Sequence, residues 1–245
     1  NKMPTLAGVW RTAHVNRYVK KVTIDDQNEK GLSIRIDWIL NDIQVPYMME
    51  YLICNNGAIV VTGSIDLTGT KLPELPRFGM RMELHQPYEN LTYYGRGPFE
   101  NYIDRYSGAF IGRYEDNVEN QFYWYIRPQE TGNKTDVRWL TLLDSGGLGV
   151  KITGLQPISF SALHFSPEDL DPGLTRKLQH TIDIVPQKNI FLHVDLKQRG
   201  LGGDNSWGMY PHNAYRLLDK KYTYSYMIEL VEKGSDKNDY LNSRK

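Results

Sequence analysis

Apolar and polar residues alternate along much of this chain. In residues 32–40 every second position is apolar, with Ser33, Arg35 and Asp37 among the positions between. Residues 222–230 repeat the same period. Since successive side chains of a strand point to opposite faces, this period predicts strands with one buried and one solvated face.

Ten further segments have strand-like composition and are bounded by turn sequences such as Asn55-Asn56-Gly57. They are residues 18–24, 45–54, 58–67, 78–85, 92–94, 139–143, 149–152, 158–163, 178–185 and 190–195. The short spacing of these twelve predicted strands favours antiparallel meanders packed as two large sheets. The expected fold class is therefore all-β.

Helix is expected to be scarce, with at most one or two short segments. Residues 166–170 are the best candidate, because Ser166 suits an N-cap, Pro167 the first helical position and Asp169 a capping box. Pro73 and Pro76 interrupt strand pairing and predict a joint between subregions rather than a domain boundary. We expect one domain over residues 1–233 and a polar tail over residues 234–245.

Composition and charge narrow the class of protein. The 17 Tyr, 5 Trp and 7 Phe suit strands, and 29 basic residues balance 29 acidic ones, which argues against a general nucleic-acid binder. No apolar run approaches the roughly 18 residues of a membrane span. Residues 1–8 lack the pattern of a signal peptide, and a chain that begins at Asn1 rather than Met is expected to be a piece of a longer protein. Cys54 is the only cysteine, which excludes an intrachain disulfide framework.

Two stretches between the predicted strands are rich in charged and polar residues. In residues 94–105, the side chains of Arg96, Glu100, Asp104 and Arg105 offer ion pairs, either as a reaction centre or as a network that pins a loop. Such networks in loops are more often structural, so we predict a structural network. In residues 123–133, Gln129, Glu130 and Asn133 are candidates for hydrogen bonds to a polyhydroxylated ligand, although a strand that ends in a polar turn explains them too.

A glycine-rich stretch at residues 200–208 surrounds Trp207. A planar indole suits the apolar C–H face of a sugar, and Asp204 and Asn205 are placed to bind its hydroxyls. A buried core tryptophan explains the same residues equally well at this point. The stretch lacks the spacing of a nucleotide-binding motif.

Four motifs follow one another along the chain. They are residues 96–105 (RGPFENYIDR), 128–133 (PQETGN), 161–170 (SALHFSPEDL) and 202–208 (GGDNSWG). Together they resemble the C-terminal, small-chain domain of the large bacterial β-galactosidases of glycoside hydrolase family 2. The resemblance implies a β-supersandwich of large antiparallel sheets, similar in fold to galactose mutarotases, as the last domain of a five-domain enzyme.

The resemblance also implies how the work is divided in such an enzyme. The two catalytic glutamates lie on a TIM barrel that is absent here, so no residue of this chain is assigned a catalytic role and the isolated chain is expected to be inactive. Trp207 matches the position that stacks on substrate, with Asp204 and Asn205 as further substrate-binding candidates. Implied partners are a β-galactoside such as lactose, the remaining domains of the parent enzyme and further copies in a homo-oligomer, in a bacterial cytoplasm or periplasm. No cofactor, metal, nucleic acid or membrane partner is implied.

Two alternatives stand beside this interpretation. A free-standing aldose mutarotase or hexose epimerase needs a general base and a general acid, commonly Glu and His, and His164 and His180 are the candidates. A lone histidine in a strand is more often a packing residue than a proton donor. The second alternative is a non-catalytic carbohydrate-binding module, for which exposed Trp and Tyr side chains suffice.

Overall fold

The computed structural model describes residues 3–85, 87–171, 173, 180–205 and 207–232. The described residues form eleven strands, three short α-helices and three 3-10 helices. The strands are β1 (Arg17–Asp25), β2 (Gly31–Leu40), β3 (Val45–Cys54), β4 (Ile59–Asp66), β5 (Arg77–Leu84), β6 (Asn90–Gly97), β7 (Phe110–Asn117), β8 (Lys134–Leu143), β9 (Gly149–Leu163), β10 (Ile190–Gln198) and β11 (Lys221–Val231). The helices are α1 (Met3–Leu6), α2 (Val9–Ala13), α3 (Pro167–Leu170), η1 (Val118–Gln121), η2 (Thr181–Asp183) and η3 (Asn213–Tyr215).

The prediction of an all-β chain is confirmed, because the structure is built from strands and its helices are short. Every strand pairing is antiparallel. Eleven of the twelve predicted segments lie in strands, and two of them, residues 149–152 and 158–163, belong to the single strand β9. The strand β9 continues through Pro157, which lies between these two segments. One strand, β7, was missed because its residues alternate without a strongly apolar face and most are exposed.

Two predictions about local structure are wrong. The strand expected at residues 178–185 is replaced by η2, whose Thr181 hydroxyl donates to the Tyr125 carbonyl; residues 178 and 179 lie outside the described part of the chain. The expectation of at most two short helices fails because α1 and α2 precede β1. Neither was visible in the sequence, and α2 has no side-chain hydrogen bond at its N-cap, Gly8.

The helix at residues 166–170 is confirmed with its caps. Asp169 N–H donates to the Ser166 side chain at 3.1 Å, and Ser166 N–H donates to the Asp169 side chain at 2.8 Å. Pro167 is the first residue of α3. This reciprocal pair satisfies two backbone donors that a helix start otherwise leaves open.

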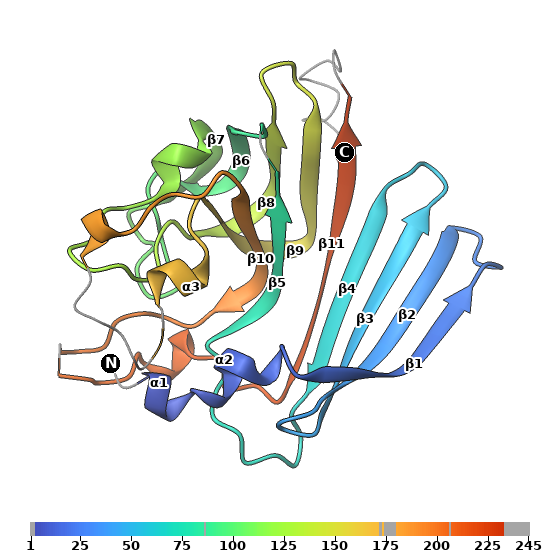
Figure 1. The fold of residues 1–245 in the computed structure, drawn as a ribbon, viewed down its shortest axis with the longest axis horizontal. Coiled ribbons are helices and arrows are strands. Elements are labelled where there is room, and N and C mark those ends of the chain that lie inside the picture. Colours follow the sequence, from blue (N-terminus) through green and yellow to red (C-terminus); the bar gives the residue numbers. More distant parts are fainter. Residues whose placement is uncertain (1–2, 86, 172, 174–179, 206, 233–245) are drawn as a thin grey trace.

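The strands form one continuous hydrogen-bonded sheet rather than two separate ones. Its main path is β1-β2-β3-β4-β11-β9-β8-β6-β7, and β10 branches from β9 to pair with β5. The long strand β9 makes this possible, because Val150–Gly154 pair with β11 while Ser159–Leu163 pair with β10. In Figure 1, β1 to β4 spread as a fan on one side of β11, and the loops described below lie on the opposite side.

Packing nevertheless gives two layers. Phe78 on β5 contacts the rings of Tyr47 on β3 and of Tyr222 and Tyr224 on β11, with centroid distances of 6.4, 5.7 and 5.6 Å, although β5 pairs with neither strand. Tyr224 also donates to the Val194 carbonyl of β10 at 3.1 Å. The branch β5–β10 therefore packs face to face on β3, β4 and β11, and the apolar core lies between them. Among the described residues, no helix is long and apolar enough to cross a membrane.

Candidate functional site

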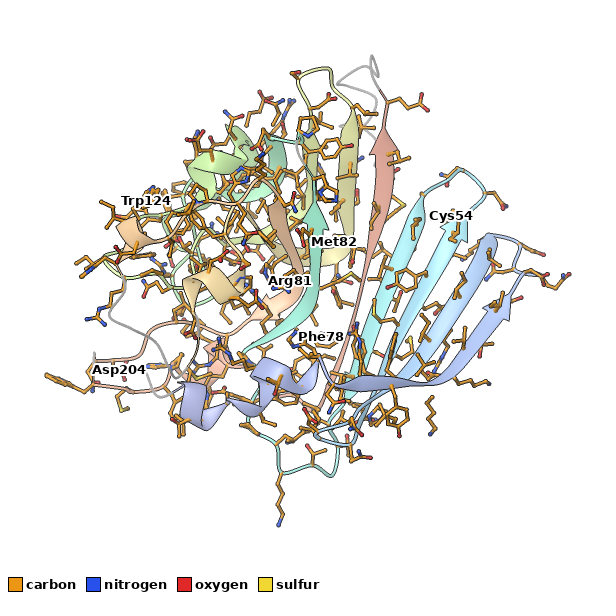
Figure 2. All side chains as sticks on the ribbon, in the orientation of Figure 1. Cys54, Phe78, Arg81, Met82, Trp124 and Asp204 are labelled. Atoms are coloured by element: carbon orange, nitrogen blue, oxygen red, sulfur yellow. The ribbon has the colours of Figure 1, made fainter. Side chains whose placement is uncertain are left out.

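The connection from β10 to β11 carries Trp207, and we call residues 199–216 the Trp207 loop. The Trp207 side chain is 93% exposed, and its backbone N–H donates to Asn205 Oδ1 at 2.9 Å. Asp204 lies at the edge of the molecule, away from the sheets (Figure 2). Trp207 is therefore not a core residue of this chain, which removes the alternative that the sequence left open.

A buried carboxylate holds the two ends of the Trp207 loop. The Glu74 side chain is 6% exposed and lies between Arg199 Nη2, at 3.3 Å, and Arg216 Nε, at 2.8 Å. The Tyr210 ring faces both guanidinium groups, at 5.8 Å from Arg199 and 4.7 Å from Arg216. We call Glu74, Arg199 and Arg216 the Glu74 clamp. Because its two arginines begin and end the loop, the clamp fixes where the loop leaves the sheet.

Glu74 of the clamp lies in the segment whose two prolines predicted a joint. Leu75, next to Glu74, forms an isolated antiparallel bridge with Leu217, just past the loop. The segment that contains the two prolines therefore also supports the Trp207 loop.

Two glycines of the loop are required by its backbone. At Gly203 a Cβ would lie 2.4 Å from the Met209 carbonyl oxygen. Gly208 has a φ of +101°, a conformation that other residues rarely adopt. Asp104 adds a contact from outside the loop, since its Oδ2 accepts from Gly202 N–H at 2.8 Å.

Asp204 is paired with a residue that sequence reasoning did not select. Its Oδ1 accepts from His212 Nε2 at 2.8 Å, and the two side chains are 68% and 65% exposed. A pair this exposed contributes little to stability. It lies beside Trp207 in the chain and presents a carboxylate and an imidazole to solvent.

Arg96, Glu100, Asp104 and Arg105 do not form one connected network. Glu100 and Arg105 pair at 2.5 Å, while Arg96 pairs with Asp136 at 2.5 Å and Asp104 contacts the Trp207 loop. The motif therefore supplies three separate contacts rather than one.

Glu100 is the best-connected of the four. Besides Arg105, it accepts from Gly132 N–H at 2.7 Å, Thr131 Oγ1 at 3.0 Å and the Tyr125 hydroxyl. Burial alone would raise the pKa of Glu100, but these donors outweigh it and hold its pKa below the usual value. The carboxylate is thus kept ionised and ties residues 125–132 to the loop after β6.

The ligand candidates of residues 123–133 are separated. Asn133 is 1% exposed and donates to the Asn101 carbonyl at 2.8 Å, so its side-chain amide serves the interior. Gln129 is exposed, and Glu130 turns instead to Arg77, at 3.2 Å. The three residues therefore do not converge on one ligand.

The two histidines considered for proton transfer are poorly placed for it. His164 uses both ring nitrogens, with Nδ1 at 3.2 Å from the Asn189 carbonyl and Nε2 at 3.0 Å from Glu89. His180 precedes η2, and the nearest carboxylate oxygen recorded for its ring belongs to Asp183, at 3.9 Å. Neither arrangement leaves a histidine and a glutamate facing a common ligand.

Comparison with known proteins places the chain in a family. Residues 1–228 match the family model described as the beta-galactosidase small chain. The chain belongs to this β-galactosidase small-chain family. Its relatives include a beta-galactosidase of Priestia megaterium, 34% identical over 230 residues, and one of Streptococcus thermophilus, 35% identical over 190 residues.

This small-chain domain matches only part of each relative. The match covers 94% of the chain and 22% of the Priestia megaterium protein, and 77% and 18% for Streptococcus thermophilus. Among solved structures, the galactosidase domain of alpha-galactosidase-sucrose kinase AgaSK aligns with a TM-score of 0.47 and 10% identity, over 89% of this chain and 28% of that one. That likeness is too distant to bear on function. In the described part of the small-chain domain, no group of three or more His, Cys, Asp or Glu is placed to bind a metal.

Sequence reasoning on the small-chain domain missed the residues that support Trp207 from a distance. Glu74 was seen only as a residue between two prolines, and Arg199, Arg216 and His212 were not selected. The sequence held only a weak signal for this support. It consisted of an acidic residue between two prolines and an arginine at each end of a glycine-rich stretch.

Proposed function

We propose that this chain is the C-terminal domain of a β-galactosidase that hydrolyses terminal β-D-galactosides of the lactose type, and that it contributes Trp207 to substrate binding. The observation that carries the proposal is the 93% exposed indole on a loop whose two ends are tied to a 6% exposed Glu74. An exposed tryptophan does not contribute the free energy that burial of its large apolar ring would add to folding. Exposure on an anchored loop suits a ring that a ligand or another domain covers.

The chemistry of hydrolysis is assigned to other parts of the enzyme. Retaining hydrolysis needs an acid/base carboxyl and a nucleophilic carboxyl about 5 to 5.5 Å apart. In our proposal both are glutamates on a TIM-barrel domain outside this chain, and this chain supplies no catalytic residue. Trp207 offers a flat apolar face to the C–H surface of the sugar or its aglycone, and Asp204 and Asn205 lie beside it for hydroxyl groups.

The same proposal gives this domain a surface for the rest of the enzyme. Residues around η2 and before Glu130 expose large apolar side chains: Tyr123 at 59%, Trp124 at 62%, Ile126 at 84%, Ile182 at 88% and Val185 at 77%. Thr181 and Tyr125 are hydrogen-bonded, so the two segments are neighbours. Apolar surface gathered in this way is typical of protein contacts. The remaining domains, and further copies in a homo-oligomer of the full-length enzyme, are the partners we propose.

Replacement of Trp207 tests the proposal. In the full-length enzyme, Trp207→Ala should raise KM for a β-galactoside about fivefold or more, because one stacking contact is worth about 1 kcal/mol or more. Trp207→Phe should recover part of the loss. Phe110→Ala removes another aromatic side chain, 74% exposed on β7, and serves as the matched control with unchanged kinetics.

The melting temperature of each variant separates binding from folding. We expect Trp207→Ala to melt with the parent enzyme, since the indole packs on little. Unaltered kinetics across β-galactosides with different aglycones would remove Trp207 from the site.

A further inference from the structure

A cavity of about 350 Å³ opens between α3 and the strands β5, β9 and β10. Small-molecule sites typically measure about 300 to 1,000 Å³. Its polar lining includes Arg77, Glu130, Ser161, His193 and Gln198, and its apolar lining includes Phe165 and Phe191. Trp207 is not part of this lining.

Arg77 organises the polar side of the cavity. Its Nη2 donates to Gln198 Oε1 at 2.6 Å and to Glu130 Oε1 at 3.2 Å, and its Nη1 lies 3.0 Å from His193 Nδ1. Its Nε is paired with the buried Asp195 at 2.8 Å. Arg77 thus occupies all of its guanidinium nitrogens with these four residues.

These contacts determine whether each remaining polar group of the cavity donates or accepts a hydrogen bond. A guanidinium only donates, so His193 Nδ1 must accept and the ring proton must be on Nε2. Gln198 must turn its oxygen to Arg77 and keep its NH₂ group on the other side. Glu130 retains Oε2 as an acceptor.

These three remaining groups are available to a ligand. None of them makes a hydrogen bond to the described residues, and none is sealed from solvent. Two donors and one acceptor therefore line a cavity that the rings of Phe165 and Phe191 also line. Hydrogen-bonding groups combined with aromatic surface are the chemistry that recognises hydroxyl groups together with a C–H face.

The charged side chains around the cavity limit the net charge that a ligand can carry. The positive charge of Arg77 is already paired with carboxylates, and Arg199 belongs to the Glu74 clamp. An anion would meet the carboxylate of Glu130, and a cation would meet Arg77. The cavity therefore favours an uncharged molecule.

We propose that this cavity binds an uncharged, polyhydroxylated molecule of monosaccharide size. The proposal goes beyond the role given to Trp207, and of the residues of its loop only Arg199 and Leu201 line the cavity. The bound molecule accepts from His193 Nε2 and the Gln198 amide, donates to Glu130 Oε2 and packs on the two rings.

The role is binding rather than catalysis. Burial, and then the positive charges of Arg77 and Arg81, lower the pKa of His193 to about 2, so the ring has no proton to give near neutral pH beyond its fixed N–H. Its other nitrogen already accepts from Arg77. The site holds a hydroxyl-bearing ligand in place without a group that moves a proton.

Titration of the 245-residue chain with D-galactose, followed by NMR of ¹³C-labelled methyl groups, tests the proposal. Leu163 and Leu170 line the cavity, whereas Met209 lies two residues from Trp207. We expect the Leu163 and Leu170 signals to shift with a millimolar Kd. Shifts confined to Met209, or no shift up to about 100 mM galactose, would overturn the proposal.

Two variants and a charged sugar test the proposed Glu130 contact and the preference for an uncharged ligand. Glu130→Gln keeps an oxygen for Arg77 but replaces the free acceptor, so galactose binding should weaken about tenfold. Gln129→Ala, at the exposed neighbouring position, is the matched control and should bind as the parent chain does. D-galacturonate should bind at least tenfold more weakly than galactose; tighter binding would identify an anion site and contradict the proposal.

The proposal for the cavity and the proposal for Trp207 can be tested independently of each other. Trp207→Ala should leave the galactose shifts of Leu163 and Leu170 unchanged. If it abolished them, the cavity would not be the binding site. If the shifts persist while Trp207→Ala has no kinetic effect in the full-length enzyme, the proposed role of Trp207 fails and the cavity stands.

Discussion

His193 is held neutral by the residues around it. Its folded-state pKa of about 2 lies far below the value of about 6.5 in an unfolded chain. Between these values the unfolded chain binds a proton that the folded chain does not, so this histidine makes the fold less stable as the pH falls below about 6.5. Asp195 acts in the opposite direction, because burial raises its pKa to about 7.

Replacing His193 isolates its contribution. His193→Asn keeps an acceptor for Arg77 and removes the titration, so its stability relative to the parent chain should rise by up to about 1.4 kcal/mol per pH unit below about pH 6. Urea unfolding of both proteins at pH 7.5, 6.0 and 5.0 measures this difference. A constant difference across the three pH values would mean that His193 titrates normally in the folded chain.

Glu100 is expected to serve stability rather than turnover. Its side chain is 9% exposed and accepts from four groups, so Glu100→Gln leaves donors without a charged partner. We expect a loss of about 2 to 3 kcal/mol in the free energy of unfolding, measured by urea titration of the 245-residue chain. Glu115→Gln, at the exposed end of a surface pair with Arg113, should change stability by less than about 0.5 kcal/mol. An unchanged melting temperature with turnover abolished in the full-length enzyme would assign Glu100 to catalysis instead.

At the scale of elements, the Glu74 clamp connects the segment before β5 to both ends of the Trp207 loop. The described residues of the loop contain η3 and no strand, so the placement of the loop depends on contacts made by other parts of the chain. Glu74 and Asp104 supply those contacts, and within the loop the Gly200 N–H donates to the Tyr215 carbonyl at 2.7 Å. Loops that act in binding are commonly positioned by a rigid scaffold in this way.

Loss of the clamp should loosen the loop without unfolding the sheet. Glu74→Gln leaves Arg199 and Arg216 beside each other without a counter-charge, so we expect faster amide hydrogen exchange in residues 200–216 and unchanged protection in β9 and β11. In the full-length enzyme KM should rise with little change in kcat. Glu115→Gln breaks only the exposed pair with Arg113 on β7 and is the control. Equal exchange in the Glu74→Gln and parent chains would show that the clamp does not position the loop.

At the scale of the whole molecule, one sheet is folded into two layers by β9. Its first half pairs with β11 and its second half with β10, which carries β5 over the faces of β3 and β11. The cavity lies along the second half of β9, and the Trp207 loop begins where β10 ends. Both candidate sites therefore depend on the strand that joins the layers.

The 245-residue chain alone should not hydrolyse a β-galactoside. The reason is chemical, since we assign both catalytic carboxyl groups to a domain that this chain does not contain. A chromogenic β-galactoside measures the activity, with the full-length enzyme as positive control. Turnover by the chain alone that Glu130→Gln or Glu100→Gln abolishes would contradict this assignment.

The sequence by itself determined what depends on neighbours along the chain. Period-2 alternation located most of the strands, the Ser166–Asp169 pair located α3, and four motifs in order indicated the family. It failed at β7, which lacks a clear apolar face, and at residues 180–185, the described part of a segment expected to be a strand, where Thr181 of η2 contacts Tyr125 instead. Local pattern is reliable only where burial on one face or a cap within a few residues decides the conformation.

The tertiary structure alone decided which charged residues meet. Glu74 and Arg216 are 142 positions apart, and Arg77 and His193 are 116 apart, so no spacing in the sequence could pair them. The predicted grouping of Arg96, Glu100, Asp104 and Arg105 held only for the pair of Glu100 and Arg105, because Arg96 contacts Asp136 and Asp104 contacts Gly202. Ion pairs and cavities depend on through-space distance and burial, which antiparallel pairing of distant strands sets, whereas alternation and caps need only the adjacent residues.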